Sequence, residues 1–170
     1  MSMTLNPVNE AAFQKAVQSL ETLNRAAVFH PTGTGKSCIA WKVVEAHPQT
    51  TFFWLVAGAQ RLALRQAELT RYNGGTLPGN VRFCDCEKLA AATPEQWVRL
   101  GEQKPSCMVL DCYHELSAVC WAQSVQKLLR MCPQAKVLGL GVPNGAPVCA
   151  AAQELFADCI VSHMTVAEAM

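Results

Sequence analysis

One stretch of the chain combines glycines, a lysine and a serine in an order that can hold a phosphate group. It reads HPTGTGKS over 30–37, after an apolar run and before a predicted helix. Gly33 and Gly35 can take positive φ, which lets backbone N–H groups turn inward on phosphate oxygens. Lys36 would then reach the β- and γ-phosphates of a nucleotide, and Ser37 would offer its hydroxyl to Mg²⁺. This stretch predicts a nucleotide-binding loop.

The match to the phosphate-loop pattern G-x-x-x-x-G-K-[ST] is incomplete, because His30 stands at its first glycine. An alternative is that the glycines only make a tight turn between a strand and a helix. The strand before the loop and the helix after it, whose N-terminus adds its dipole, favour phosphate binding. Nothing structural requires a lysine at position 36. The predicted nucleotide-binding residues within the loop are Thr32, Gly33, Thr34, Gly35, Lys36 and Ser37.

A second candidate group lies at the end of another apolar run. The sequence CMVLDCYHEL places Asp111 after a predicted strand, followed by Cys112, Tyr113 and His114. An aspartate at the carboxyl end of a parallel strand can order Mg²⁺ beside a bound phosphate. The alternative is an ordinary aspartate at a strand end. We favour the Mg²⁺ role, with Ser37 and Asp111 as the metal-binding pair.

The elements that must position these residues alternate along the whole chain. Strands are expected at 25–30, 50–58, 81–86, 107–112, 136–142 and 158–163. Helices are expected at 9–23, 36–46, 60–72, near Trp97 after a capping box at Thr93, at 116–131 and near 148–156. Asn9 is the expected cap of the first helix. This alternation is typical of an α/β domain with helices on both faces of a mostly parallel sheet. One domain accounts for residues 1–170.

Composition excludes several classes of protein. The net charge is +1 and 51% of residues are apolar, which argues against a broad basic surface for nucleic acid. No apolar run approaches the roughly 18 residues of a membrane span, and the N-terminus does not resemble a signal peptide. The nine scattered cysteines indicate thiols in a cytoplasmic protein, and Cys84 and Cys86 are expected to pack rather than bind metal.

The loop and its flanks resemble a known family. PTGTGKS is similar to the first motif of superfamily 2 helicases, of the DEAD/DEAH-box and type III restriction-enzyme-like kind. FQKAVQSL upstream resembles the segment whose glutamine, here Gln14, binds nucleotide. FFWLVAGAQRLALRQ resembles motif Ia, and LFADCIVSHMTVAEAM resembles the end of the first RecA-like domain. The resemblance implies a three-layer, RecA-like P-loop NTPase domain that uses ATP and Mg²⁺.

Two further motifs depart from that family. Its second motif is Asp-Glu-x-His or Asp-Glu-x-Asp, and here Cys112 replaces the glutamate that activates water. Loss of a general base typically lowers the reaction rate by a factor of about 10²–10⁴. The third motif, Ser/Thr-Ala-Thr, is replaced by GLGVPNG at 139–145, which lacks the hydroxyls. The catalytic residues that the resemblance implies are therefore Lys36, Asp111 and His114, with hydrolysis of ATP weak or lost.

The resemblance also implies partners. Relatives contact DNA or RNA through motif Ia, where this chain carries Arg61, Arg65 and Arg71. The simpler interpretation of these arginines is a solvated helical face, which the neutral net charge favours. The family's core has a second RecA-like domain that supplies an arginine finger. We expect that domain in cis or in trans, since 1–170 correspond to the first domain alone.

The leading hypothesis is an ATP-binding domain of a helicase-like protein. A P-loop kinase for small molecules is a second hypothesis, but kinases need a lid with several arginines, and the loop at 72–80 has none. A regulatory or scaffold module that has kept the fold and lost its nucleotide is a third. The phosphate-loop lysine argues against that alternative.

Overall fold

The strands form a single six-stranded sheet in the computed structural model, which describes residues 3–111, 119–143 and 150–169. Their order in the sheet is β3-β2-β4-β5-β1-β6, and every pair of neighbours is parallel. The strands are β1 (Arg25–Phe29), β2 (Phe52–Val56), β3 (Val81–Asp85), β4 (Cys107–Asp111), β5 (Lys136–Gly141) and β6 (Ile160–His163). All six strands predicted from the sequence are therefore present.

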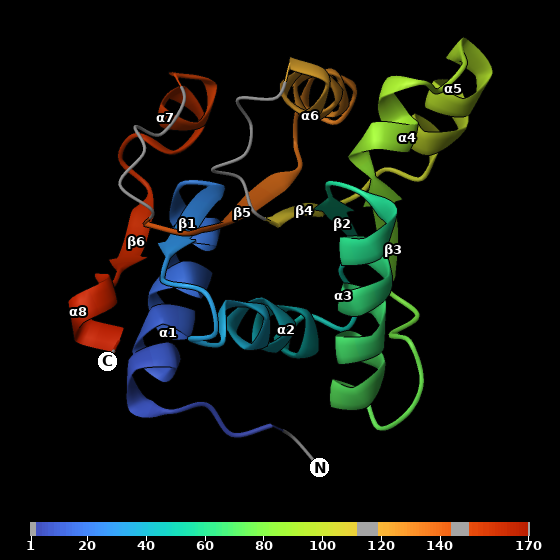
Figure 1. The fold of residues 1–170 in the computed structure, drawn as a ribbon. Helices are drawn as coiled ribbons and strands as arrows, with labels where there is room; N and C mark the ends of the chain where they lie inside the picture. The colour runs from blue at the N-terminus through green and yellow to red at the C-terminus, as the bar shows by residue number, and fades with distance from the viewer. Residues whose placement is uncertain (1–2, 112–118, 144–149, 170) are drawn as a thin grey trace.

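Helices cover both faces of this sheet, as Figure 1 shows. One face carries α1 (Pro7–Thr22), α2 (Lys36–Ala46) and α3 (Ala59–Tyr72). The other carries α4 (Cys86–Ala90), α5 (Pro94–Glu102), α6 (Val119–Met131) and α7 (Ala150–Phe156). A short α8 (Val166–Ala169) follows the edge strand β6. The predicted three-layer α/β fold with a parallel central sheet is confirmed.

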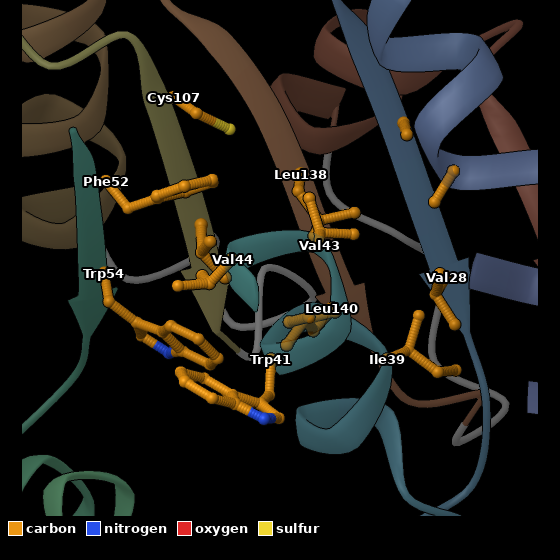
Figure 2. Packing of buried hydrophobic residues seen from close by; sticks show 14 of the residues in the cluster. Val28, Ile39, Trp41, Val43, Val44, Phe52, Trp54, Cys107, Leu138 and Leu140 are labelled. Atoms are coloured by element: carbon orange, nitrogen blue, oxygen red, sulfur yellow. The ribbon is translucent and has the colours of Figure 1, made fainter. Parts of the chain in front are cut away.

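Each face has its own apolar core, because side chains alternate along each strand. Val109 of β4 faces the α1–α3 side, whereas Met108 and Leu110 face the other. Figure 2 shows the first core, where Ile39, Trp41, Val43 and Val44 of α2 lie against the strands. The residues of β2 and β4 are all buried, which explains their unbroken apolar runs.

The N-terminal cap predicted for α5 is confirmed, whereas the one predicted for α1 is wrong. Thr93 forms the predicted capping box with Gln96 at the start of α5. The predicted cap at Asn9 is wrong: Asn6 caps α1, and Pro7 takes its first position. That shift leaves Asn9 inside the helix, where its side chain is free to contact another segment. The two short helices α4 and α8 were not predicted, and β3 ends at Asp85 rather than at residue 86.

The six cysteines whose side chains the structure describes are thiols: Cys38, Cys84, Cys86, Cys107, Cys132 and Cys159. Cys84, Cys86 and Cys107 are buried in the two cores, as the packing interpretation predicts. Burial raises the pKa of Cys84 and of Cys107 to about 12, so these thiols stay protonated. No cluster of three or more potential metal ligands occurs among the residues that the structure describes. No helix in those same segments is long and apolar enough to cross a bilayer.

Candidate nucleotide site

The phosphate loop leaves the carboxyl end of β1 and leads directly into α2. The amide of His30 still donates to the Gly141 carbonyl of β5 at 3.2 Å, so the chain leaves the sheet only after residue 30. Gly33 (φ 83°) and Gly35 (φ 90°) both have left-handed backbone conformations. Gly35 caps α2 and accepts from the Cys38 amide at 2.9 Å. The amides before Cys38 therefore precede the first hydrogen bond inside the helix, where anions bind.

Lys36 folds back across the loop. Its ammonium donates to the carbonyls of His30 at 2.8 Å and of Pro31 at 2.7 Å. Thr34 adds a bond from its hydroxyl to the same Pro31 carbonyl at 2.7 Å. Residues 30–36 thus form a closed turn with the ammonium on its inner side. A cation held in this way, next to the N-terminus of a helix, suits a polyphosphate.

Asn9 of α1 is a loop contact that the sequence analysis missed. Its side-chain amide is 5% exposed and donates to the Thr34 carbonyl at 2.8 Å. Its Oδ1 is buried without a partner among the described residues. Asn9 follows the helical spacing of Ala12 and Ala16, both of which are buried. A polar residue on an apolar helical stripe was therefore the signal that could have indicated this contact.

His30 is fully buried beneath the loop, at the position of the missing first glycine. Its Nε2 shares a hydrogen bond of 2.8 Å with the Ser162 hydroxyl of β6. Burial, together with the smaller effects of the charges of Lys36 and His163, lowers the pKa of His30 to about 4. The imidazole is consequently neutral at physiological pH. It packs under the ammonium without adding charge of its own.

Asp111 lies at the end of β4, two strands away from the loop, with β5 between them. It shares the face of Val109, which is the face that α2 and α3 cover. Its side chain is 4% exposed, and Oδ2 accepts from the Trp54 indole at 3.2 Å and from Arg65 Nε at 2.5 Å. The predicted Mg²⁺ ligand is therefore already paired with a cation from α3.

The interpretation of the three α3 arginines as a solvated helical face is wrong for Arg65. Its side chain is 19% exposed and forms ion pairs with both Asp111 and Glu68. Burial lowers the pKa of Arg65, but attraction and hydrogen bonds to the two carboxylates outweigh it and raise the pKa. Arg61 and Arg71 do lie on the exposed part of the helix, as predicted. Sequence alone assigned Arg65 to solvent because arginine is usually found there.

Ser37, the other predicted metal ligand, lies beside a tyrosine. The Cys38 thiol hydrogen-bonds to the Tyr72 hydroxyl at the end of α3 at 3.3 Å, and the neighbouring Ser37 side chain lies close to the same hydroxyl. Burial raises the pKa of Tyr72, and its bond to Cys38 raises it further. Tyr72 therefore remains a neutral hydroxyl between the two side chains. Both predicted metal ligands are in contact with α3.

The remaining predicted residues are those of the loop, Gln14 of α1, and residues outside the described segments. In the loop, Thr32 and Gly33 form the exposed tip, and Thr34 to Ser37 are half-buried. Gln14 is exposed on α1 and donates to Glu10 at 2.9 Å, whereas Asn9 is the residue of this helix that contacts the loop. His114 and Cys112 lie outside the described residues, as does the end of the GLGVPNG segment.

A separate cleft of about 450 Å³ is lined by residues of α6 and α7. Apolar side chains line it together with Arg130 and Glu154. It shares no residue with the loop, and we do not include it in the candidate site.

No protein-family model and no curated protein matches the sequence. Solved structures are nevertheless similar in fold. A hypothetical ATP-dependent RNA helicase from Sulfolobus tokodaii superposes with a TM-score of 0.63 at 11% identity, over 91% of this chain. Domain III of the replication initiation protein DnaA from Thermotoga maritima gives 0.54 at 10% identity, over 96%.

A third similar structure is the ATP-dependent Type ISP restriction-modification enzyme LlaBIII bound to DNA, with a TM-score of 0.58 at 13% identity over 82% of this chain. The chain spans 51%, 65% and 13% of these three proteins, in the order given. At such low identity the comparisons establish the fold alone.

Proposed function

We propose that this chain binds ATP through residues 30–37, as the first RecA-like domain of a helicase-like protein. The observation that carries the proposal is the Lys36 ammonium, held on the inner side of a turn that contains two left-handed glycines and opens α2. The ATP-dependent proteins with the same fold support it. The polyphosphate would lie on the first amides of α2, with Lys36 facing it.

Hydrolysis is proposed to be weak or lost in the isolated domain. Cys112 replaces the glutamate of the resembled motif, and a protonated thiol is a poor base. Asp111 is held by Arg65 and Trp54. A second RecA-like domain, in cis or in trans, would have to supply the arginine finger, which contributes about 10³–10⁵ in rate where it occurs.

The proposal includes contact with DNA or RNA through the motif Ia region. A helicase and a DNA-bound enzyme among the similar structures favour it. Only Arg61 and Arg71 of the three arginines are exposed for such a contact, because Arg65 pairs with carboxylates inside the domain.

A thermal-shift measurement tests nucleotide binding. Millimolar ATP or ADP should stabilise the wild-type chain, by about 2.7 kcal/mol at a concentration of 100 Kd. Adenosine, which lacks phosphates, should give no shift. Lys36→Ala should lose the ATP shift, while Lys15→Ala, an exposed lysine of α1, should keep it as the matched control. No ATP shift in the wild type would contradict the proposal and favour a module without nucleotide.

Turnover is tested separately. Steady-state release of phosphate by the isolated chain should be near background, and Cys112→Glu should increase it. Appreciable hydrolysis by the wild type would show that the motif change does not abolish activity. No gain in Cys112→Glu would identify the second domain as the main requirement. Transfer of phosphate to a small acceptor would instead favour the kinase hypothesis.

A further inference from the structure

Three residues of α3 form one inward-facing stripe across the candidate site. Arg65, Leu69 and Tyr72 are four and then three positions apart, so they lie on the same side of the helix. Leu69 is fully buried in the core between α3 and the sheet, which fixes the direction of the stripe. Arg65 and Tyr72 therefore project toward the sheet on either side of it.

Each end of this stripe reaches one of the two predicted Mg²⁺ ligands or its neighbour. Arg65 Nε lies 2.5 Å from Asp111 Oδ2, and the Tyr72 hydroxyl accepts from the thiol of Cys38, the residue next to Ser37. These two contacts come from one helix and reach the two parts of the site that a metal would join. Arg65 is further held in place by Glu68, one turn along the same helix.

The donor set does not fit a magnesium ion. Mg²⁺ requires near-octahedral oxygen ligands at close range and binds through carboxylates with open lone pairs. Asp111 Oδ2 already accepts from a guanidinium and an indole, and the guanidinium would repel a divalent cation at the same carboxylate. Arg65 would have to leave Oδ2 before a cation could approach it, and its second ion pair with Glu68 holds it in place.

We infer that the site binds the polyphosphate of a nucleotide without a divalent cation, with Arg65 supplying to Asp111 the positive charge that a metal supplies in an Mg²⁺ site. This inference rests on the proposed nucleotide binding and deepens it. Lys36 and the amides of the loop then hold the phosphates by themselves. Arg65 acts as a positioning residue, since it contacts Asp111 rather than the loop.

Calorimetric titration of the wild-type chain tests the inference directly. ATP and ADP are titrated in millimolar Mg²⁺ and again with the metal removed by excess EDTA. The dissociation constant in excess EDTA should be no higher than the one in Mg²⁺, because a metal that gains no ligand from the protein cannot tighten nucleotide binding. By reciprocity, the affinity of Mg²⁺ for the protein–nucleotide complex should not exceed the affinity of Mg²⁺ for free nucleotide.

Arg65→Gln identifies the residue responsible. Once the guanidinium is absent, Asp111 becomes available to a cation, and Mg²⁺ should tighten nucleotide binding by about tenfold or more. Arg99→Gln removes the same charge from an exposed position on α5 and should leave the ratio of dissociation constants at its wild-type value. An unchanged ratio in folded Arg65→Gln would overturn the role of Arg65.

The remaining outcomes distinguish this inference from the proposed function. Wild-type binding that requires Mg²⁺ would overturn the inference and leave nucleotide binding intact. Binding in neither condition would contradict the proposed function, and the inference with it. If Arg65→Gln does not fold, the wild-type comparison with and without metal decides by itself.

Discussion

Asn9 Nδ2 lies 2.8 Å from the point that a Cβ on Gly35 would occupy, so the first helix limits the residue type in the phosphate loop. The same amide donates to the neighbouring Thr34 carbonyl. Gly35 also has φ of 90°, a conformation that residues with a side chain rarely adopt. Two independent constraints therefore act on one position of the loop.

Gly35→Ala should destabilise the chain by about 2 kcal/mol, from backbone strain and from the contact with Asn9. Urea unfolding measures this change. Gly33→Ala is the matched control, because Gly33 is equally left-handed (φ 83°) but has open space where a Cβ would lie. It should cost about 1 kcal/mol, from the conformation alone.

Adding Asn9→Ala to Gly35→Ala should then recover part of the loss, because it removes the atom that the new methyl group meets. A double-mutant cycle isolates this coupling. Strictly additive effects of the two substitutions would contradict the predicted contact.

The pair between Arg65 and Asp111 should contribute to stability as well as to the site. Arg65→Ala leaves the Asp111 carboxylate, whose side chain is 4% exposed, without its guanidinium and should cost about 3 kcal/mol or more. The free energy of unfolding in urea gives the value. Asp111→Asn in the Arg65→Ala background removes the charge and should restore much of the loss. A cost below about 1 kcal/mol for Arg65→Ala would indicate a pair that behaves like an exposed one.

Stability should also fall between neutral pH and pH 4 because of His30. Its folded pKa of about 4 is below the unfolded value of 6.5, so the unfolded chain takes up the proton first as the pH falls. The contribution is fully present above pH 6.5, and up to about 3 kcal/mol is lost by pH 4. Unfolding free energies across this range measure the slope.

His30→Gln should flatten that slope, because glutamine keeps hydrogen-bonding capacity near Ser162 but does not titrate. The comparison is between the two slopes rather than between the two stabilities at one pH. Identical slopes in wild type and variant would show that other groups cause the loss of stability in acid.

The sequence by itself determined the local parts of this protein. The alternation of apolar strands and helices predicts the parallel sheet, because a strand buried on both faces needs an unbroken apolar run, as in β2. The loop could also be predicted from the sequence, because Gly33, Gly35 and Lys36 act through backbone conformation and through contacts within a few residues.

Only the tertiary structure decided what the charged and polar groups contact. Arg65 and Asp111 are 46 positions apart, and neither residue type indicates the other. Their meeting depends on the alternation along β4, which turns Asp111 toward α3, and on burial of Leu69, which sets the rotation of α3. Asn9 likewise meets the loop only because α1 packs beside α2. Hydropathy specifies which face of an element is buried, whereas the partner of a buried polar group depends on how elements distant in sequence pack together.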